Sequence, residues 1–152
     1  MRMYFFVPYN ISEIQKGIQA GHASLEYARL FGDTPEFKYF VQSQKTWVIL
    51  NGGTTMDADV RGNRGTMQEI EEMLWGGGIP YTSFNEPDLN NALTALCFLA
   101  PEQVYDREIY PDLPPCGENE KYGFEAIEAW VKGLGGRKNV FLRQLITGKH
   151  LA

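Results

Sequence analysis

The chain has 152 residues, of which 43% are apolar and 22% are charged, so we expect one globular α/β domain with its own core. The net charge of −5 argues against a protein that coats nucleic acid through a positive field. The two cysteines, Cys97 and Cys116, have no metal-ligand spacing, so neither a metal nor a cofactor is expected and a reducing cytoplasm is favoured. The opening residues do not resemble a signal peptide, and no apolar run approaches the ~20 residues that a membrane helix needs, so no membrane partner is expected.

The first half of the chain alternates strand and helix signals. Aromatic and β-branched residues at 2–8 predict a strand, and Ser12 with Gln15 has the spacing of a capping box that opens a helix to about Phe31. A second capping box begins at Thr66 and opens a helix that ends at the glycines 76–78. The remaining expected elements are a short helix at 35–41, strands at 45–51, 80–84 and 93–100, a loop at 52–65 without periodicity, and a turn at 85–91.

This order, β-α-(α)-β-α-β-β, predicts a four-stranded mixed sheet flanked by helices over residues 1–102. Residues 103–152 are expected to be a helical extension packed on this core or on a second subunit, with a homodimer favoured. Its expected helices, at about 122–134 and 138–146, carry apolar residues on one face and place basic residues outward, where they face a phosphate-bearing ligand, a partner or only solvent. The apolar residues are Ile127, Trp130, Val131, Val140, Phe141, Leu145 and Ile146, and the basic ones are Arg137, Lys138 and Arg143.

A helical wheel of the first long helix separates an apolar and a polar stripe. We expect Ile14, Ile18, Gly21, Leu25 and Ala28 to face the core. A polar stripe beside them allows two interpretations, a solvated edge or a site that a ligand approaches closely over small residues. Its members are Gln15, Gln19, His22 and Glu26.

The turn before the last strand holds two carboxylates, Glu86 and Asp88, on either side of Pro87, and Thr94 follows at the start of that strand. A rigid, partly desolvated turn can tune a carboxylate as a base or let it order a hydroxyl. The alternative is an acidic turn in which Asp88 caps its own backbone.

The loop at 52–65 offers Thr54, Arg61 and Arg64 as anion contacts, because it leads into a helix N-terminus. It lacks the Gly-Lys-Ser/Thr of a P-loop, and a merely flexible solvent loop is the other interpretation.

Taken together, these motifs resemble those of the type-2 peptidyl-tRNA hydrolases, over roughly residues 3–101 and in a divergent form, such as a phage homologue would have. Gln19, His22 and Ala23 match a helix motif of that family, Gly78-Ile79-Pro80 matches its third strand, and Thr94 opens a matching apolar strand that ends at Pro101. At a position where the family carries a lysine, this chain has Gln15, and the nearest lysine is Lys16.

The resemblance implies a peptidyl-tRNA hydrolase II-like fold and an esterase that cleaves peptidyl-tRNA or a related RNA-linked acyl ester. Its implied catalytic residues are Gln19, His22, Thr94 and either Glu86 or Asp88, and Gln15, Lys16, Thr54, Arg61 and Arg64 are candidate ligand contacts. Two alternatives stay open. One is a catalytically degenerate binder on the same fold that sequesters a nucleotide or cyclic oligonucleotide signal, as a phage would against host defence. The other is a structural assembly protein.

Overall fold

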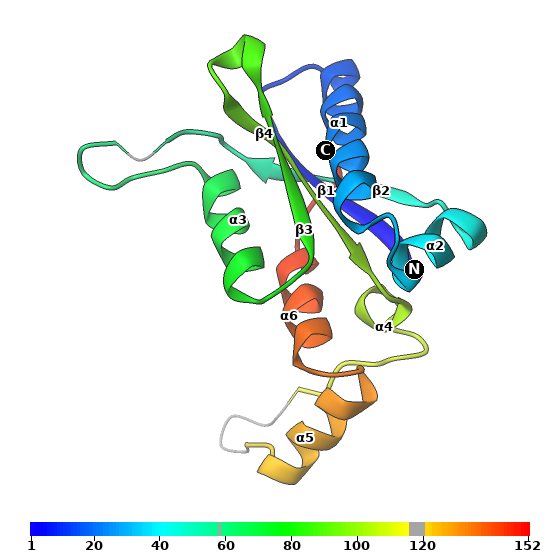
Figure 1. Cartoon of the computed structure of the whole chain (residues 1–152). Helices are drawn as coiled ribbons and strands as arrows, with labels where there is room; N and C mark the ends of the chain where they lie inside the picture. Colours follow the sequence, from blue (N-terminus) through cyan, green and yellow to red (C-terminus); the bar gives the residue numbers. More distant parts are fainter. Residues whose placement is uncertain (58, 116–120) are drawn as a thin grey trace. The chain divides into compact units, whose positions relative to one another are not determined.

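The computed structural model describes residues 1–57, 59–115 and 121–152 (Figure 1). These residues form two compact units, one of residues 1–99 with 148–152 and the other of residues 100–147. The elements of the first unit are β1 (Arg2–Pro8), α1 (Glu13–Phe31), α2 (Pro35–Ser43), β2 (Trp47–Gly53), α3 (Thr66–Gly76), β3 (Tyr81–Glu86), the 3₁₀ helix η1 (Pro87–Leu89) and β4 (Ala92–Ala100).

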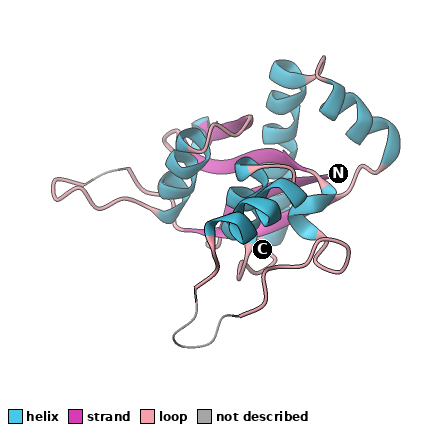
Figure 2. Cartoon of the chain, turned by 90° about the horizontal axis from the view of Figure 1, so that it is seen from below, coloured by secondary structure: helices cyan, strands magenta, loops and turns pink. Residues whose placement is uncertain are grey.

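The four strands form one mixed sheet in the order β2-β1-β4-β3, which confirms the predicted four-stranded α/β architecture. β1 and β2 are parallel, with Phe5 opposite Ile49, and α1 and α2 connect them. β3 and β4 are antiparallel, with Ser83 opposite Leu96, and η1 connects them. Figure 2 shows helices flanking the strands of this sheet.

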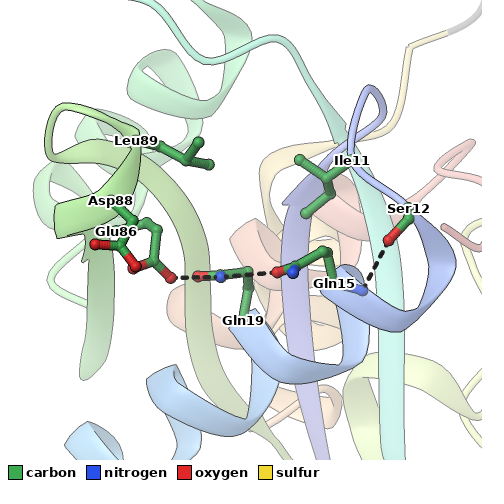
Figure 3. Close-up of a pocket in the computed structure, with 7 residues that line it drawn as sticks. All are labelled: Ile11, Ser12, Gln15, Gln19, Glu86, Asp88 and Leu89. Carbon is green, nitrogen blue, oxygen red and sulfur yellow. Dashed lines mark hydrogen bonds between the residues drawn. The ribbon is translucent and has the colours of Figure 1, made fainter.

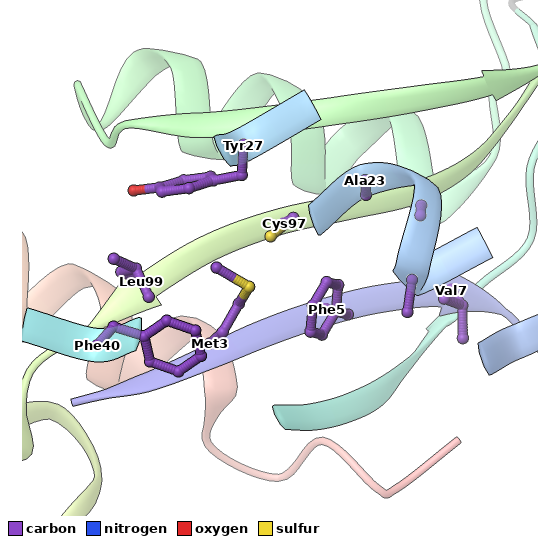
Figure 4. Packing of buried hydrophobic residues seen from close by; sticks show 10 residues of the cluster. Met3, Phe5, Val7, Ala23, Tyr27, Phe40, Cys97 and Leu99 are labelled. Carbon is purple, nitrogen blue, oxygen red and sulfur yellow. The ribbon is translucent and has the colours of Figure 1, made fainter. Parts of the chain in front are cut away.

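The sheet buries residues on both faces because helices pack on both of them. Alternate residues of β1 and β4 pack under α1 and α2 on one face (Figure 4). Intervening aromatic residues stack on the other face, with the Tyr4 and Phe98 ring centroids 5.8 Å apart. α3 contacts β1, β2 and β3 and lies across the sheet from α1 in Figure 1. The core under α1 and α2 consists of Met3, Phe5, Val7, Ala20, Ala23, Tyr27, Phe40, Ala95, Cys97 and Leu99.

The face of α1 that packs on the sheet is not the one predicted from the wheel. Ile14 and Leu25 are 77% and 69% exposed, and Ile18 is also exposed. The predicted apolar face was therefore wrong. The sheet already presents Met3 and Phe5, so the helix approaches it with small residues and with the stems of two polar ones. The residues of α1 that are buried are Lys16, Gln19, Ala20, Ala23 and Tyr27.

The two predicted capping boxes have different outcomes. Ser12 is the N-cap of α1, and its hydroxyl accepts the backbone N–H of Gln15. The second capping box was wrong, because Gly65 is the N-cap of α3. The Thr66 hydroxyl instead donates to the Gly52 carbonyl and accepts the backbone N–H of Thr54, which ties the start of α3 to the end of β2.

The second unit contains α4 (Glu102–Tyr105), α5 (Phe124–Gly133) and α6 (Arg137–Ile146). The two predicted helices correspond to α5 and α6, and α4 was not predicted. The expectation that Arg143 points outward was wrong, because only 2% of this residue is exposed. No helix in the described ranges is both long and apolar enough to cross a membrane.

Candidate functional site

A cleft of about 320 Å³ opens in the first unit between the start of α1 and the turn that follows β3 (Figure 3). The N-cap of α1 supplies one wall, and η1 supplies the other. Gln19 reaches the cleft from the second turn of α1, and Glu86 reaches it from the last position of β3. The cleft is lined by Ile11, Ser12, Gln15, Gln19, Glu86, Asp88 and Leu89.

A chain of side-chain hydrogen bonds runs from β4 through α1 to the end of β3. The Thr94 hydroxyl donates to Oε1 of Gln19 at 2.6 Å, and Nε2 of Gln19 donates to the Glu86 carboxylate at 2.7 Å. Thr94 is 1% exposed and Gln19 is 2% exposed. These contacts join residues that are 75 and 67 positions apart in the sequence. The chain therefore fixes α1 relative to both strands of the β3-β4 hairpin.

The direction of this chain follows from which groups can donate. An ionised carboxylate only accepts, so the Gln19 amide must turn its N–H groups toward Glu86. Its oxygen then faces Thr94 and accepts the hydrogen bond that the Thr94 hydroxyl donates. The second N–H of Gln19 has only a long contact, 3.5 Å, with Oε1 of Gln15. Gln19 is thus held in one orientation, and its second N–H can reach a ligand in the cleft only by giving up the long contact with Gln15.

The Asp88 carboxylate and the side-chain N–H groups of Gln15 are polar groups of the cleft that have no hydrogen-bond partner among the described residues. Asp88 lies in η1 between Pro87 and Leu89 and is exposed. The Asp88 carboxylate has no hydrogen bond or ion pair with any residue that the structure describes. The Gln15 side chain is exposed, and its N–H groups point to no described acceptor. A ligand would therefore meet a free acceptor on one wall and a free donor on the other.

The charge of the cleft is negative. Two carboxylates line it, and none of the described lining residues is a lysine or arginine. The nearest basic residue in the sequence, Lys16, is 9% exposed and pairs with Glu13 at 2.8 Å. The cleft consequently suits hydroxyls, amides and amines better than it suits a bare phosphate.

Several predicted site residues lie outside this cleft. His22 is exposed and does not line it. Its ring stacks on Phe84 with the centroids 4.5 Å apart, one turn along α1 from Gln19. Thr94 stands behind the cleft and reaches it only through Gln19.

The three predicted contacts in the loop at 52–65 are also elsewhere. Arg64 pairs with Glu72 of α3, and the Thr54 hydroxyl accepts the backbone N–H of Thr66. Arg61 is exposed in the loop, where its backbone N–H donates to Asp59. None of these three residues is among those that line the cleft.

Sequence reasoning missed Ile11, Ser12 and Leu89 as lining residues. Ser12 had already been predicted as an N-cap, and an N-cap lies beside the residues of the first turn, so Gln15 and Ser12 could have been paired. Ile11 and Leu89 are apolar residues next to turn residues, a pattern that occurs too widely to single them out.

Neither a scan against protein-family models nor a search of curated proteins found a match to this chain.

Proposed function

We propose that this chain hydrolyses an acyl ester attached to an RNA end, with peptidyl-tRNA as the first substrate to test. The observation that carries the proposal is the buried Thr94–Gln19–Glu86 chain, which ends in a cleft where Asp88 is unpaired. Buried polar chains that are fully satisfied hold their members in one geometry, which a catalytic site needs. The sequence resemblance to the type-2 peptidyl-tRNA hydrolases supports the same reaction.

In the proposed reaction, water attacks the ester carbonyl carbon and the Asp88 carboxylate accepts a proton from that water. The bond between the carbonyl carbon and the ribose oxygen then breaks. The ribose oxygen takes the proton that Asp88 accepted and leaves as a hydroxyl, which returns Asp88 to its carboxylate form. The Gln15 amide and the second N–H of Gln19 lie on the opposite side of the cleft, where they can donate to the developing oxyanion. Glu86 keeps Gln19 in place and is a positioning residue.

The test is turnover of peptidyl-tRNA by the purified full chain, measured as release of free tRNA over time. Asp88→Asn should lower the rate by about 100-fold or more, since general bases contribute roughly that much. Asp33→Asn is the matched control, because Asp33 is an exposed carboxylate of the first unit outside the cleft and should leave the rate unchanged. Wild-type turnover that Asp88→Asn does not affect would remove Asp88 from the reaction.

A second function is favoured by one specific observation, the lack of a lysine or arginine among the described residues that line the cleft. A site without a cation beside the ester can bind without accelerating hydrolysis. In that case the chain is a binder on the same scaffold that sequesters a nucleotide or cyclic oligonucleotide through its hydroxyl and base amine groups, since the cleft suits these better than a phosphate. Calorimetric binding of such a compound, lost in Gln19→Ala and accompanied by no ester turnover, would select this function over the first.

A further inference from the structure

The second unit contains a cavity of its own, about 240 Å³ in volume, that the proposed ester hydrolysis does not use. α6 supplies one side of it, Trp130 of α5 supplies another, and the segment after α4 closes it. Its lining residues are Arg107, Asp112, Leu113, Trp130, Val140, Arg143, Gln144 and Thr147.

Two guanidinium groups among the lining residues share one carboxylate. Nε of Arg143 donates to Oδ1 of Asp112 at 2.7 Å, and Nη1 of Arg107 lies 2.9 Å from Oδ2 of the same residue. Arg143 also donates to the backbone carbonyls of Gln103 and Tyr110, so it is fixed and nearly fully buried. The second unit is therefore built around a buried cation.

The charges of the lining residues do not cancel. Two arginines face one aspartate, which leaves one positive charge in the cavity. Arg143 makes three hydrogen bonds of its own, whereas the side chain of Arg107 is 47% exposed. Nη1 of Arg107 faces Asp112 and Nη2 donates to the Thr147 hydroxyl at 2.6 Å, so Nε and the second hydrogen on each terminal nitrogen are the N–H groups left for a ligand. The Gln144 amide is exposed beside it and has no hydrogen bond to any residue of the described ranges.

The cavity also has apolar lining residues, namely Leu113, Val140 and Trp130. Nε1 of the Trp130 indole donates to the Pro111 carbonyl at 3.1 Å, which restrains the ring. A restrained aromatic ring offers a stacking surface for a planar group, and arginine is the preferred partner of phosphate. A small anion that carries a planar ring can use both kinds of lining residue.

We propose that this cavity binds a mononucleotide, with the phosphate on Arg107 and Gln144 and the base against Trp130. The site is separate from the cleft of the first unit and does not depend on the function proposed for that cleft. Asp112 has two roles in it. It neutralises part of the cationic charge, and it holds both arginines in place.

The test is isothermal titration calorimetry of the full chain with adenosine monophosphate, adenosine, ribose 5-phosphate and inorganic phosphate as separate probes. We expect adenosine monophosphate to bind most tightly, because only it offers both a ring and a phosphate. Arg107→Gln should weaken its binding by about tenfold or more, the effect of losing one charge-assisted contact. Arg137→Gln is the matched control, since Arg137 pairs with Glu128 outside the cavity and its loss removes the same charge.

A second variant keeps the test decisive if Arg107→Gln is poorly folded, which circular dichroism would reveal. Asp112→Asn removes the only negative charge among the described lining residues and keeps an amide oxygen that can still accept from Arg143, so it should tighten phosphate binding, the opposite sign to Arg107→Gln. The proposal is overturned if adenosine monophosphate does not bind, or if Arg107→Gln and Arg137→Gln weaken it equally. It is also overturned if inorganic phosphate binds as tightly as the nucleotide, or if binding is lost in Asp88→Asn, which would place the ligand in the first unit.

Discussion

At the scale of single residues, Gln19 couples the buried interior to the cleft. Thr94 and Gln19 exchange a buried hydrogen bond, so their contributions to the free energy of unfolding should not be additive. We expect a double-mutant cycle of Thr94→Val and Gln19→Ala to give a coupling of about 1 kcal/mol in urea denaturation. Thr82 donates to the Ala23 carbonyl on the same helix but does not touch Gln19, so Thr82→Val with Gln19→Ala should be additive. Equal coupling in both cycles would contradict the proposed chain.

The proposed ester hydrolysis makes a prediction for Gln15. A lysine in its place would extend from the wall of the cleft opposite Asp88, on the side where the proposed reaction develops its oxyanion. We therefore expect Gln15→Lys to raise the rate of peptidyl-tRNA hydrolysis, and a cation at a developing oxyanion is worth about 3 kcal/mol in the favourable case. The measurement is kcat under saturating substrate. Gln15→Met is the control, because methionine is also a long unbranched side chain but carries no charge. A rate that falls in both variants would show that the amide itself is needed.

Asp59 organises the tip of the loop between β2 and α3. The side-chain amide of Asn63 and the backbone N–H groups of Asn63 and Arg61 donate to its carboxylate, and they lower the pKa of Asp59 below its ordinary value. The order that this carboxylate gives the loop is fully present above the ordinary pKa of aspartate, ~3.9, and is lost as the pH falls through the lower, folded value. We expect Asn63→Ala to raise the pKa of Asp59 in a carboxyl NMR titration. Arg61→Ala should change it little, because Arg61 contributes only its backbone N–H.

At the scale of elements, the packing face of α1 can be tested directly. Ala23 is fully buried against the sheet, so Ala23→Leu should overpack the core and cost about 1–3 kcal/mol of unfolding free energy. Leu25 is 69% exposed, and Leu25→Ser should stay within about 0.5 kcal/mol of the wild type. The helical wheel predicts the reverse ranking. Urea denaturation midpoints of the two variants therefore decide between the two faces.

The positions of helices and strands could be predicted where capping residues and apolar runs in the local sequence determine them. Ser12 determines where α1 begins, and the apolar runs of β1 and β4 place both strands. The predicted ends of the strands were less accurate. Lys45 was expected in β2, but its φ of 50° lies in the left-handed region, which excludes it from a strand. β3 continues to Glu86 because that residue pairs with Ala92 across the hairpin. Asn85 and Glu86 are polar residues without strand propensity, so the sequence did not indicate that the strand extends through them.

The site was only partly predictable, for a physical reason. The sequence pointed to Gln19, Glu86 and Asp88, and the structure brings these three to one cleft. It could not show that Thr94 lies behind the cleft or that His22 stacks on Phe84, because both depend on which face of α1 meets the sheet. That face is chosen by volume complementarity between helix and sheet, and apolar periodicity alone does not encode it.

At the scale of the whole molecule, the chain returns to its first unit after α6. Residues 148–152 belong to the unit that contains the sheet, and Leu151 forms an antiparallel bridge with Leu50 of the edge strand β2. The backbone N–H of Asn51 donates to the His150 carbonyl, and the N–H of Ala152 donates to the Ile49 carbonyl. This segment covers part of an edge that would otherwise present unpaired backbone groups.

Removal of residues 148–152 should therefore destabilise the first unit and make it prone to associate through β2. Each lost backbone hydrogen bond contributes about 1 kcal/mol, so we expect the urea midpoint to fall measurably and light scattering to rise during refolding. Leu151→Ala is the control for the side chain, which is 75% exposed and should contribute little. Ala152→Pro removes one donor without shortening the chain and should give an intermediate effect. A truncated chain that keeps the wild-type midpoint and stays monodisperse would mean that the edge strand needs no cover.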